Sequence, residues 1–361
     1  MPGLTDESVR AILRLQAYKP PKTSYDSMPL SRRAAVLVLL FPDIHGRLRV
    51  VLTLRSEQLR NFAGQVALPG GKADTLTETP EDTARREAYE EIGLPLPNHN
   101  FVLLAPPSWN SSDHQSLDAE KQQIRFSVTH LTELPCHFSQ NNLSVRPVVA
   151  VLLPASIQKD VPHSPSDVVL NSVNKLDIPI DLESLLIPRL DPKEVSAVFS
   201  IPLEAFLATT YAREYTKPPT PTSEDWYRGK LQNWYGRDWY MHEFMAPVWA
   251  HKAVTAGRGA ARVGYNDKLM SPEETVLLAR GSKIEEEKEE VLMHYRVWGM
   301  TARILIDVAR IAYEKEPEFE CLKEKGDEDV IAWLLDHGML KEERKHGEEF
   351  FVNEMFKKGN L

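Results

Sequence analysis

Three glutamates stand close together near the end of one acidic stretch of the sequence. Glu87, Glu90 and Glu91 are spaced i, i+3 and i+4, so on a helix they would share one face. In the last turn each carboxylate costs about 0.3–1 kcal/mol, because the helix dipole presents its negative end there. A divalent cation offsets this repulsion, and Mg²⁺ favours a few carboxylates together with water and phosphate oxygens. The spacing predicts a metal site, and an ordinary solvated acidic face is the alternative.

The helix that must hold these glutamates has start and stop signals in the sequence. Thr79 is a suitable N-cap, Pro80 suits the first helical position, and Asp82 stands at the capping-box position. Gly93 supplies the stop signal. We therefore predict a helix over residues 80–91. Its buried stripe is expected to consist of Ala84, Ala88 and Ile92.

A pair of glycines precedes this helix. Gly70 and Gly71 follow Pro69, and a backbone without side chains can turn and pass close to a ligand. A strand, a glycine loop and a helix in this order would hold the carboxylate face beside a chain of phosphates. We therefore expect Gly70 and Gly71 to border the substrate.

Two adjacent stretches carry a resemblance to a known family. The run Arg86-Glu-Ala-Tyr-Glu-Glu-Ile-Gly-Leu94, preceded by Gly71, resembles the Nudix box, whose family members hydrolyse diphosphates linked to another moiety. Residues 52–71 resemble the extra motif of the coenzyme A diphosphatase branch of Nudix hydrolases. The resemblance implies an α/β fold, namely a Nudix α/β/α sandwich with a mixed β-sheet, large insertions and a helical C-terminal extension.

The sequence departs from the pattern of that branch at three positions. Phe62 stands where the branch usually has His, and Leu68 stands where it usually has Phe. At the first acidic position of the box the chain has Thr77, with Glu78 next to it. These departures bear on substrate preference more than on hydrolysis.

The resemblance also implies roles for the acidic residues. Glu87 and Glu91 are the first-choice ligands for Mg²⁺ or Mn²⁺, and Glu90 is the third. The metal would lower the pKa of a bound water for in-line attack on phosphorus. The general base would be a carboxylate of the box or Glu194, which opens a strand where several Nudix enzymes carry a catalytic Glu; a capping or surface carboxylate is the alternative for Glu194.

Basic residues within the two stretches are candidates for binding phosphate. Arg55, Arg60 and Lys72 could contact the diphosphate or the adenosine 3′-phosphate of coenzyme A, and each could instead form a structural ion pair. Arg86 is expected to pair with Glu78 or Asp74 and to fix the loop before the helix.

The implied activity is a metal-dependent cleavage of coenzyme A, or of its acyl or disulfide forms, into adenosine 3′,5′-bisphosphate and (acyl-)phosphopantetheine. A diphosphatase for ADP-ribose, a dinucleotide or an oxidised nucleoside triphosphate is the alternative within the class. A Nudix-fold protein that binds nucleotides without hydrolysis is the alternative outside it.

The length of 361 residues suits about two domains, or one domain with large insertions. Strand-like runs lie at 34–41, 48–54, 101–104, 145–153 and 194–202, and an apolar helix is expected at 297–313. We predict an N-terminal extension over 1–30, a Nudix domain over 31–313 and a helical tail over 314–361. Insertions are expected near 107–142, 155–192 and 209–290; the aromatic cluster between Trp226 and Trp249 is expected to be packing within the last of these.

The net charge and the length of the apolar runs limit the kinds of partner that we expect for the chain. The formal net charge of −9 argues against a general nucleic-acid binder, which needs a basic surface. The apolar run 34–41 is far shorter than the roughly 20 residues of a membrane span. Two cysteines form no disulfide framework, so an intracellular site is expected. The resemblance suggests a peroxisome or mitochondrion, with the cytoplasm open; the partner is a small-molecule substrate, and the oligomeric state is left open.

Overall fold

A computed structural model of the chain describes residues 4–96, 100–104, 123–154, 190–212, 226–234, 237–249, 253–255, 274–278 and 292–340. The statements below refer to these residues. Most of the expected insertion at 155–192 and the end of the expected tail, residues 341–361, lie outside them.

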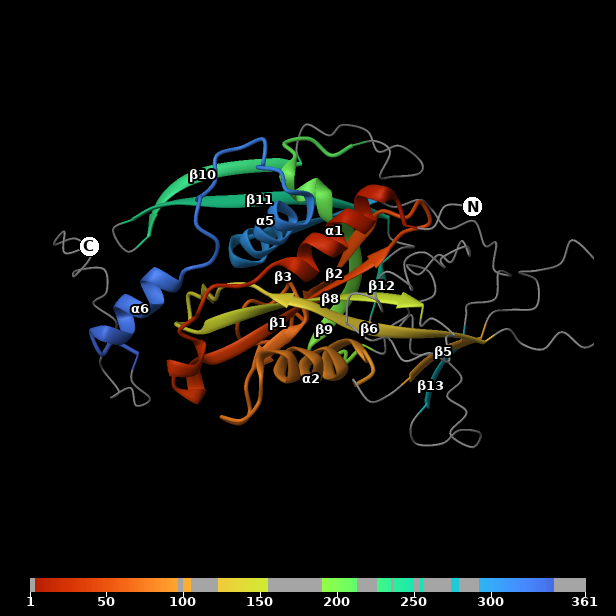
Figure 1. The fold of residues 1–361 in the computed structure, drawn as a ribbon, viewed down its shortest axis with the longest axis horizontal. Coiled ribbons are helices and arrows are strands. Elements are labelled where there is room, and N and C mark those ends of the chain that lie inside the picture. The colour runs from red at the N-terminus through yellow and green to blue at the C-terminus, as the bar shows by residue number, and fades with distance from the viewer. Residues whose placement is uncertain are drawn as a thin grey trace, which may run out of the picture.

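A mixed sheet of eleven strands forms the centre of the molecule (Figure 1). Along its main path the order is β12-β9-β2-β1-β8-β6-β5-β13, while β3 pairs with β2, β4 with β1 and β7 with β8. Strand β1 runs parallel to β8 and antiparallel to β2, so the sheet is mixed as predicted. The strands are β1 (Arg33–Pro42), β2 (Leu48–Arg55), β3 (Val66–Ala67), β4 (Gly70–Lys72), β5 (Asn100–Leu104), β6 (Gln123–Glu133), β7 (His137–Phe138), β8 (Ser144–Pro154), β9 (Val195–Pro202), β12 (Val254–Thr255) and β13 (Glu274–Leu278).

Helices cover both faces of this sheet, which gives the expected α/β/α sandwich (Figure 1). Helix α2 (Pro80–Ile92) lies on one face, and α1 (Asp6–Ala17) with α5 (Gly299–Tyr313) lies on the other. Strand β1 shows how alternation builds the layers, because successive side chains point to opposite faces. Leu37 and Leu39 pack with Ala84 and Ala88 of α2, whereas Val38 and Leu40 join the cluster that contains α1 and α5.

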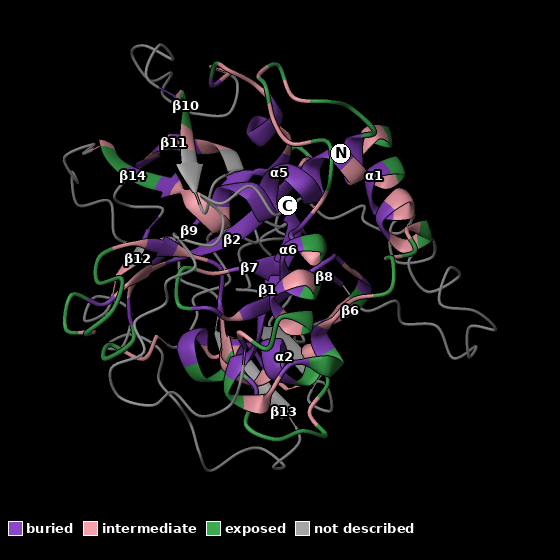
Figure 2. Cartoon of the chain, turned by 90° about the vertical axis from the view of Figure 1, so that its left-hand side faces the viewer, coloured by how far each residue is buried: buried purple, intermediate pink, exposed green. Residues whose placement is uncertain are grey.

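The predicted boundaries of α2 are confirmed. The Thr79 side chain accepts a hydrogen bond from the Asp82 amide, and the Asp82 side chain accepts one from the Thr79 amide, which completes the capping box. Gly93 ends the helix in the left-handed conformation at φ 68°. The expected stripe of Ala84, Ala88 and Ile92 is buried. Figure 2 shows the contrast between this buried side of α2 and its exposed side.

A second, three-stranded sheet lies outside α5 and adds a layer that the sequence did not predict (Figure 1). Its strands are β10 (Tyr227–Trp234), β11 (Arg237–Trp249) and β14 (Leu292–Trp298). Trp226 is buried against Phe206 and Phe244, so the part of the aromatic cluster that is described here is packing, as predicted. Figure 2 shows α5 buried along most of its length between the two sheets.

Two expected boundaries differ from the structure. The helix expected over 297–313 begins at Gly299, because Val297 and Trp298 end β14 and Gly299 turns the chain with φ 61°. Within the expected insertions, β6 lies in the central sheet and β10 and β11 form the second sheet. The domain limits themselves stay predictions.

Short helices complete the described part of the chain. They are the 3₁₀ turns η1 (Tyr25–Ser27), η2 (Leu30–Arg32) and η4 (Leu203–Leu207), and helix α6 (Glu328–Asp336) in the expected tail. A buried ion pair between Arg303 and Asp327, 2.9 Å long, joins α5 to the start of α6. No helix among the described residues is long and apolar enough to cross a membrane.

Candidate active site

The last turn of α2 lies against the glycine strand β4. Glu91 is buried with 5% of its surface exposed, and one of its carboxylate oxygens accepts a hydrogen bond from the Gly70 amide at 3.3 Å. A side chain at Gly71 would collide with the carboxylate of Glu87, so the missing Cβ makes room for Glu87. The glycine pair therefore borders two of the three predicted ligands.

These carboxylates carry more negative charge than the surroundings compensate. Burial raises the pKa of Glu91 to about 8, and the charges of Glu87 and Glu194 add to this effect. The Gly70 amide and the charge of Arg55 act in the opposite direction. Burial also raises the pKa of Glu87, against the opposing effect of Arg86. The last turn of α2 therefore carries several carboxylate oxygens that could bind a cation.

Arg86 holds the loop before α2 and two of the glutamates. Its guanidinium donates to Glu78 at 2.8 Å and to the Lys72 carbonyl at 2.8 Å. It also donates to Glu87 at 3.0 Å and to the more exposed Glu90 at 3.4 Å. The expected pairing with Glu78 is confirmed, whereas the contacts with Glu87 and Glu90 were not predicted, although the i, i+4 spacing of Arg86 and Glu90 is a signal for one of them.

Glu78 is the acidic residue next to Thr77, which stands at the first acidic position of the box. Besides its bonds with Arg86, Glu78 accepts a hydrogen bond from the Asp74 amide at 2.7 Å. These hydrogen bonds hold the pKa of Glu78 below its usual range in spite of partial burial. Asp74 itself lies 3.5 Å from Arg86, so both expected partners contact this arginine. Thr77 bonds instead to Thr75 at 3.1 Å.

Glu194 lies at the start of β9, on the side of the sheet that carries the carboxylates. Its side chain is exposed, and its charge acts on both Glu87 and Glu91. Two backbone bonds hold the segment, since the Asp191 amide donates to the Glu91 carbonyl at 3.1 Å and the Ser56 amide donates to the Glu194 carbonyl at 2.8 Å. The structure therefore brings Glu194 to the end of α2, from 103 positions further along the sequence than Glu91.

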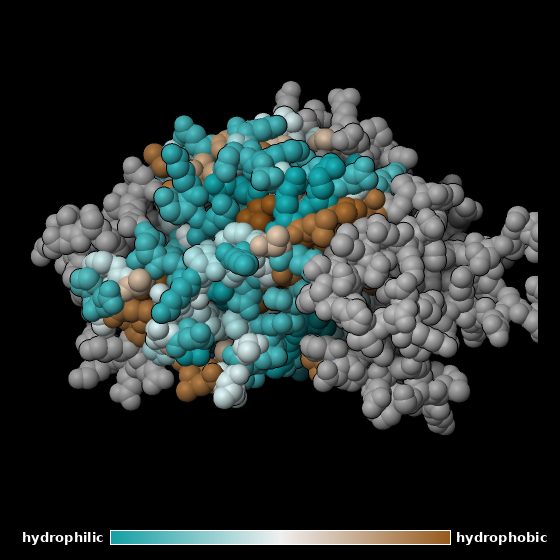
Figure 3. Space-filling model, in the orientation of Figure 1, coloured by the Kyte–Doolittle hydropathy of each residue, from teal (hydrophilic) through white to brown (hydrophobic). Residues whose placement is uncertain are grey.

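The candidate phosphate ligands differ in their positions. Arg55, at the end of β2, is partly buried, and its Nε atom has no hydrogen-bond partner although it is fully shielded from solvent. Lys72 is exposed at the end of β4. Arg60 is exposed on the loop 56–65, and within the described residues it forms no hydrogen bond or ion pair with the carboxylates. Of these three candidates, Arg55 is the residue whose charge acts on Glu91. Figure 3 shows that the surface around α2 is largely hydrophilic.

The donor set suits a hard divalent cation by its chemistry. Mg²⁺ and Mn²⁺ bind carboxylate oxygens, and the raised pKa values of Glu87 and Glu91 indicate charge that a cation would neutralise. In the conformation described, no three Asp, Glu, His or Cys side chains of the described residues converge closely enough to hold an ion. Arg86 donates to one carboxylate oxygen of Glu87 and to one of Glu90, so it competes with a cation for these two oxygens.

Comparisons with known proteins agree with this geometry. Residues 31–137 match the family model described as NUDIX domain. The chain is 30% identical over 332 residues to Peroxisomal coenzyme A diphosphatase 1 of Saccharomyces cerevisiae, which covers 91% of this chain and 83% of that protein.

Two plant proteins are also similar along most of the chain. Nudix hydrolase 15, mitochondrial, of Arabidopsis thaliana is 28% identical over 296 residues, or 81% of this chain and 64% of that protein. Nudix hydrolase 22, chloroplastic, of the same plant is 26% identical over 288 residues, or 80% of this chain and 58% of that protein. The match thus spans less than two thirds of the length of each plant protein.

Proposed function

Since the chain belongs to the Nudix hydrolase family, we propose that it hydrolyses the diphosphate of coenzyme A and of its derivatives. The products are adenosine 3′,5′-bisphosphate and (acyl-)phosphopantetheine, and the cofactor is Mg²⁺ or Mn²⁺. The similarity to a coenzyme A diphosphatase along 91% of the chain supports the choice of substrate.

The observation that carries this proposal is the buried Glu91 carboxylate next to the glycine strand. With 5% exposure and a pKa raised to about 8, the Glu91 carboxyl is ionised in the folded chain only at a cost in stability, and a bound cation would offset this cost. The missing Cβ of Gly71 leaves room for the Glu87 carboxylate, so both glutamates lie against the glycine strand. This local excess of negative charge matches a diphosphate substrate that arrives with a metal ion.

Each candidate residue has a role in this proposal. Glu87 and Glu91 hold the metal, with Glu90 as a third ligand once it leaves Arg86. A metal bound there would lower the pKa of the attacking water. Its positive charge would also offset the negative charge of the diphosphate. Glu194 accepts the proton of the attacking water, because it is exposed and its charge acts on the buried Glu91 and the half-buried Glu87.

The basic residues act on the phosphates of the substrate. Arg55 has a shielded Nε without a hydrogen-bond partner among the described residues, and its charge acts on Glu91, so we assign its guanidinium to a phosphate oxygen. Lys72 and Arg60 are exposed cations at the rim, next to the glycine strand and on the loop 56–65. They support binding of the diphosphate and of the 3′-phosphate.

A panel of diphosphates tests the proposal. The purified chain is incubated with Mg²⁺ or Mn²⁺ and coenzyme A, dephospho-coenzyme A, ADP-ribose, a diadenosine polyphosphate or an oxidised nucleoside triphosphate, and the products are identified by mass spectrometry. We expect the highest kcat/KM for coenzyme A, with dephospho-coenzyme A cleaved less efficiently because it lacks the 3′-phosphate. Preference for another member of the panel contradicts the substrate assignment. Binding without turnover in either metal contradicts the enzymatic assignment.

An organellar site follows from the same relatives. The names of the yeast protein and of one plant protein place them in peroxisomes and mitochondria, respectively. We therefore infer that this chain works in one of these two compartments. Co-localisation of the tagged chain with peroxisomal and mitochondrial markers tests this, and a diffuse signal contradicts it.

A further inference from the structure

Phe62 combines two unfavourable features on the loop that borders the acidic site. Its backbone has φ 55°, a left-handed conformation that residues with a Cβ adopt rarely and at a cost. Its side chain is 39% exposed. Within the described part of the chain no aromatic ring packs against it, so the exposed part of the phenyl ring has no stacking partner there.

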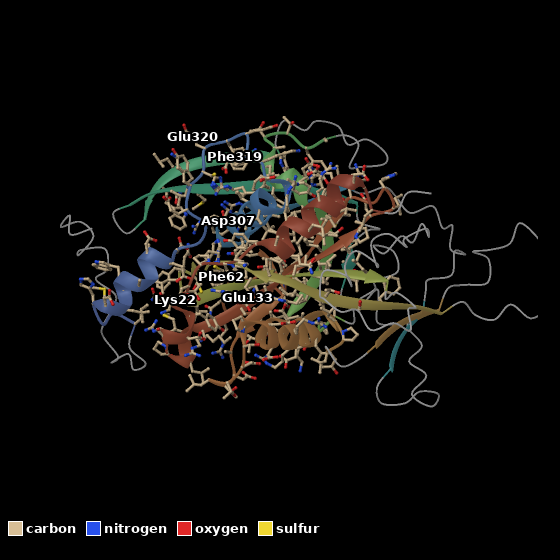
Figure 4. All side chains as sticks on the ribbon, in the orientation of Figure 1. Lys22, Phe62, Glu133, Asp307, Phe319 and Glu320 are labelled. Atoms are coloured by element: carbon tan, nitrogen blue, oxygen red, sulfur yellow. The ribbon has the colours of Figure 1, made fainter. Side chains whose placement is uncertain are left out.

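The loop that carries Phe62 is fastened to the site at its base. The Arg55 amide donates to the Gln65 carbonyl at 2.9 Å, and the Gly64 amide donates to the Arg55 carbonyl at 3.1 Å. The Gln65 amide donates to the Phe62 carbonyl at 3.2 Å, which closes the turn around Phe62. The bond between Ser56 and Glu194 attaches the same loop to β9. Figure 4 labels Phe62 near the middle of the molecule, above α2 in this view.

Folding alone does not account for the residue type at this position. A glycine would adopt the left-handed backbone without strain and would expose no apolar surface. Ile44 offers a comparison, because it is 45% exposed in the turn at the other end of β2, where its backbone has no positive φ. Only Phe62 combines an exposed ring with a strained backbone among the described residues.

We propose that Phe62 is a specificity-determining residue whose ring stacks on the purine base of the substrate. This inference rests on the proposed function, since it requires a substrate with an adenosine half. The same loop and its base carry Arg55 and the exposed Arg60. Two cations and a flat apolar face match the half of coenzyme A that joins charged phosphates to a flat base, whereas the pantetheine arm is neutral and flexible.

Inhibition by the two separate product halves tests this proposal. Turnover of coenzyme A is measured for the wild type and for Phe62→Ala, Phe62→Gly and Phe62→Trp, with adenosine 3′,5′-bisphosphate or phosphopantetheine as inhibitor. In Phe62→Ala we expect KM for coenzyme A and the inhibition constant of adenosine 3′,5′-bisphosphate to rise about tenfold, the scale of a lost stacking contact. We expect kcat to stay within about twofold and the inhibition constant of phosphopantetheine to stay unchanged.

The other variants separate the ring from the backbone. Phe62→Trp should retain the affinity for adenosine 3′,5′-bisphosphate, because indole also stacks on a base. Phe62→Gly should weaken binding as Phe62→Ala does, yet unfold at a higher temperature than Phe62→Ala, because glycine relieves the left-handed strain. Ile44→Ala, an equally exposed apolar change outside the site, should leave all these constants unchanged.

Contrary outcomes are distinct. A wild type that cleaves coenzyme A, with a Phe62→Ala variant that binds adenosine 3′,5′-bisphosphate equally well, overturns the stacking role and leaves the proposed function intact. Loss of affinity for phosphopantetheine alone assigns the ring to the other half of the substrate and also overturns the proposal. A wild type without activity on coenzyme A removes both.

Discussion

The burial of Glu91 fits its proposed role as a metal ligand better than a role in folding. Its carboxylate is buried next to Glu87, and it receives a hydrogen bond from one backbone amide. Burying an ionised carboxylate without a full set of hydrogen-bond or ion-pair partners lowers the free energy of unfolding. Residues with strongly perturbed pKa values gather at functional sites for this reason. At the scale of the single residue, stability and function oppose each other here.

Replacing Glu91 by Gln should therefore separate activity from stability. We expect kcat to fall by about 100-fold or more, because a charged group that acts on the reacting centre is lost. The free energy of unfolding of the metal-free protein should rise by about 1–3 kcal/mol, because the burial of a charge and its repulsion by Glu87 are removed. Turnover of coenzyme A and urea unfolding in the presence of a chelator measure the two effects.

Glu81→Gln is the matched control on the same helix. Glu81 lies in the first turn of α2, away from the acidic end, so activity should remain near the wild-type value. A Glu91→Gln variant that keeps full turnover would remove Glu91 from the site. A variant that loses stability would show that the carboxylate has partners the structure does not reveal.

Residue-level interpretation of the sequence succeeded where the partners are near in sequence. Arg86 and Glu78 are close along the chain, and their pairing was predicted and is confirmed. The contact of Gly70 with Glu91 depends on how β4 packs on α2, and the sequence did not predict it. Thr77 was interpreted as a departure from the box, and its neighbour Glu78 makes the predicted contact with Arg86.

At the scale of elements, the two glycines of β4 differ in what lies behind them. A Cβ at Gly70 would collide with the backbone of Ala35 and Val36 in the neighbouring strand, and Gly70 also has a positive φ of 155°. For a Cβ at Gly71 the three nearest atoms all belong to the carboxylate end of the Glu87 side chain. Gly70 is thus required by the packing of the sheet, and Gly71 by the position of Glu87 in the proposed site.

Alanine substitutions should show this difference. Gly70→Ala should lower the free energy of unfolding by about 3 kcal/mol or more, because backbone atoms of β1 cannot move away without breaking the sheet. Gly71→Ala should cost about 1 kcal/mol, yet it should lower kcat/KM at least tenfold, because Glu87 is displaced from the site. Denaturant unfolding and steady-state kinetics measure both. Equal losses of stability for the two variants would contradict the assignment.

Elements with local signals were predicted more accurately than those that depend on distant pairing. The caps of α2 lie within the helix and its neighbours, so its limits were predicted almost to the residue. Strand β11 pairs with β14 across a large sequence separation, and β10 pairs with its neighbour β11; this second sheet was not predicted from the sequence. Strand β6 lies in a region that was interpreted as an insertion for the same reason.

At the scale of the whole molecule, a buried histidine lies between the second sheet and the segment that connects α5 to α6. His242 of β11 is 3% exposed, and its Nδ1 lies 3.1 Å from the Tyr227 hydroxyl. Its ring also lies near Phe319 in the segment between α5 and α6. Burial lowers the pKa of His242 to about 4, the charge of Arg303 adds to this effect, and Asp307 opposes it.

The stability of the assembled layers should therefore decrease in mild acid. In the unfolded chain a histidine takes up a proton near pH 6.5, whereas His242 in the folded chain stays neutral down to about pH 4. The unfolded state binds more protons between these values, so the free energy of unfolding falls as the pH falls through this window, by up to about 3 kcal/mol. Urea unfolding at a series of pH values measures the slope.

His242→Gln should flatten this slope, because glutamine does not titrate. His45→Gln, a change in the exposed turn between β1 and β2, should leave the slope as it is in the wild type. An unchanged slope in His242→Gln would assign the acid sensitivity to other groups.

The hydrogen bond from the Asp191 amide to the Glu91 carbonyl affects how the length of related chains can change in evolution. It fastens the entrance of β9 to the terminus of α2, while β8 is independently anchored by pairing with β1 and β6. The spacing of Glu91 and Glu194 is therefore decoupled from the number of residues between Pro154 and Leu190. Because the entropy of closing a loop grows only logarithmically with its length, lineages can trim or extend that stretch while the proposed site keeps its dimensions.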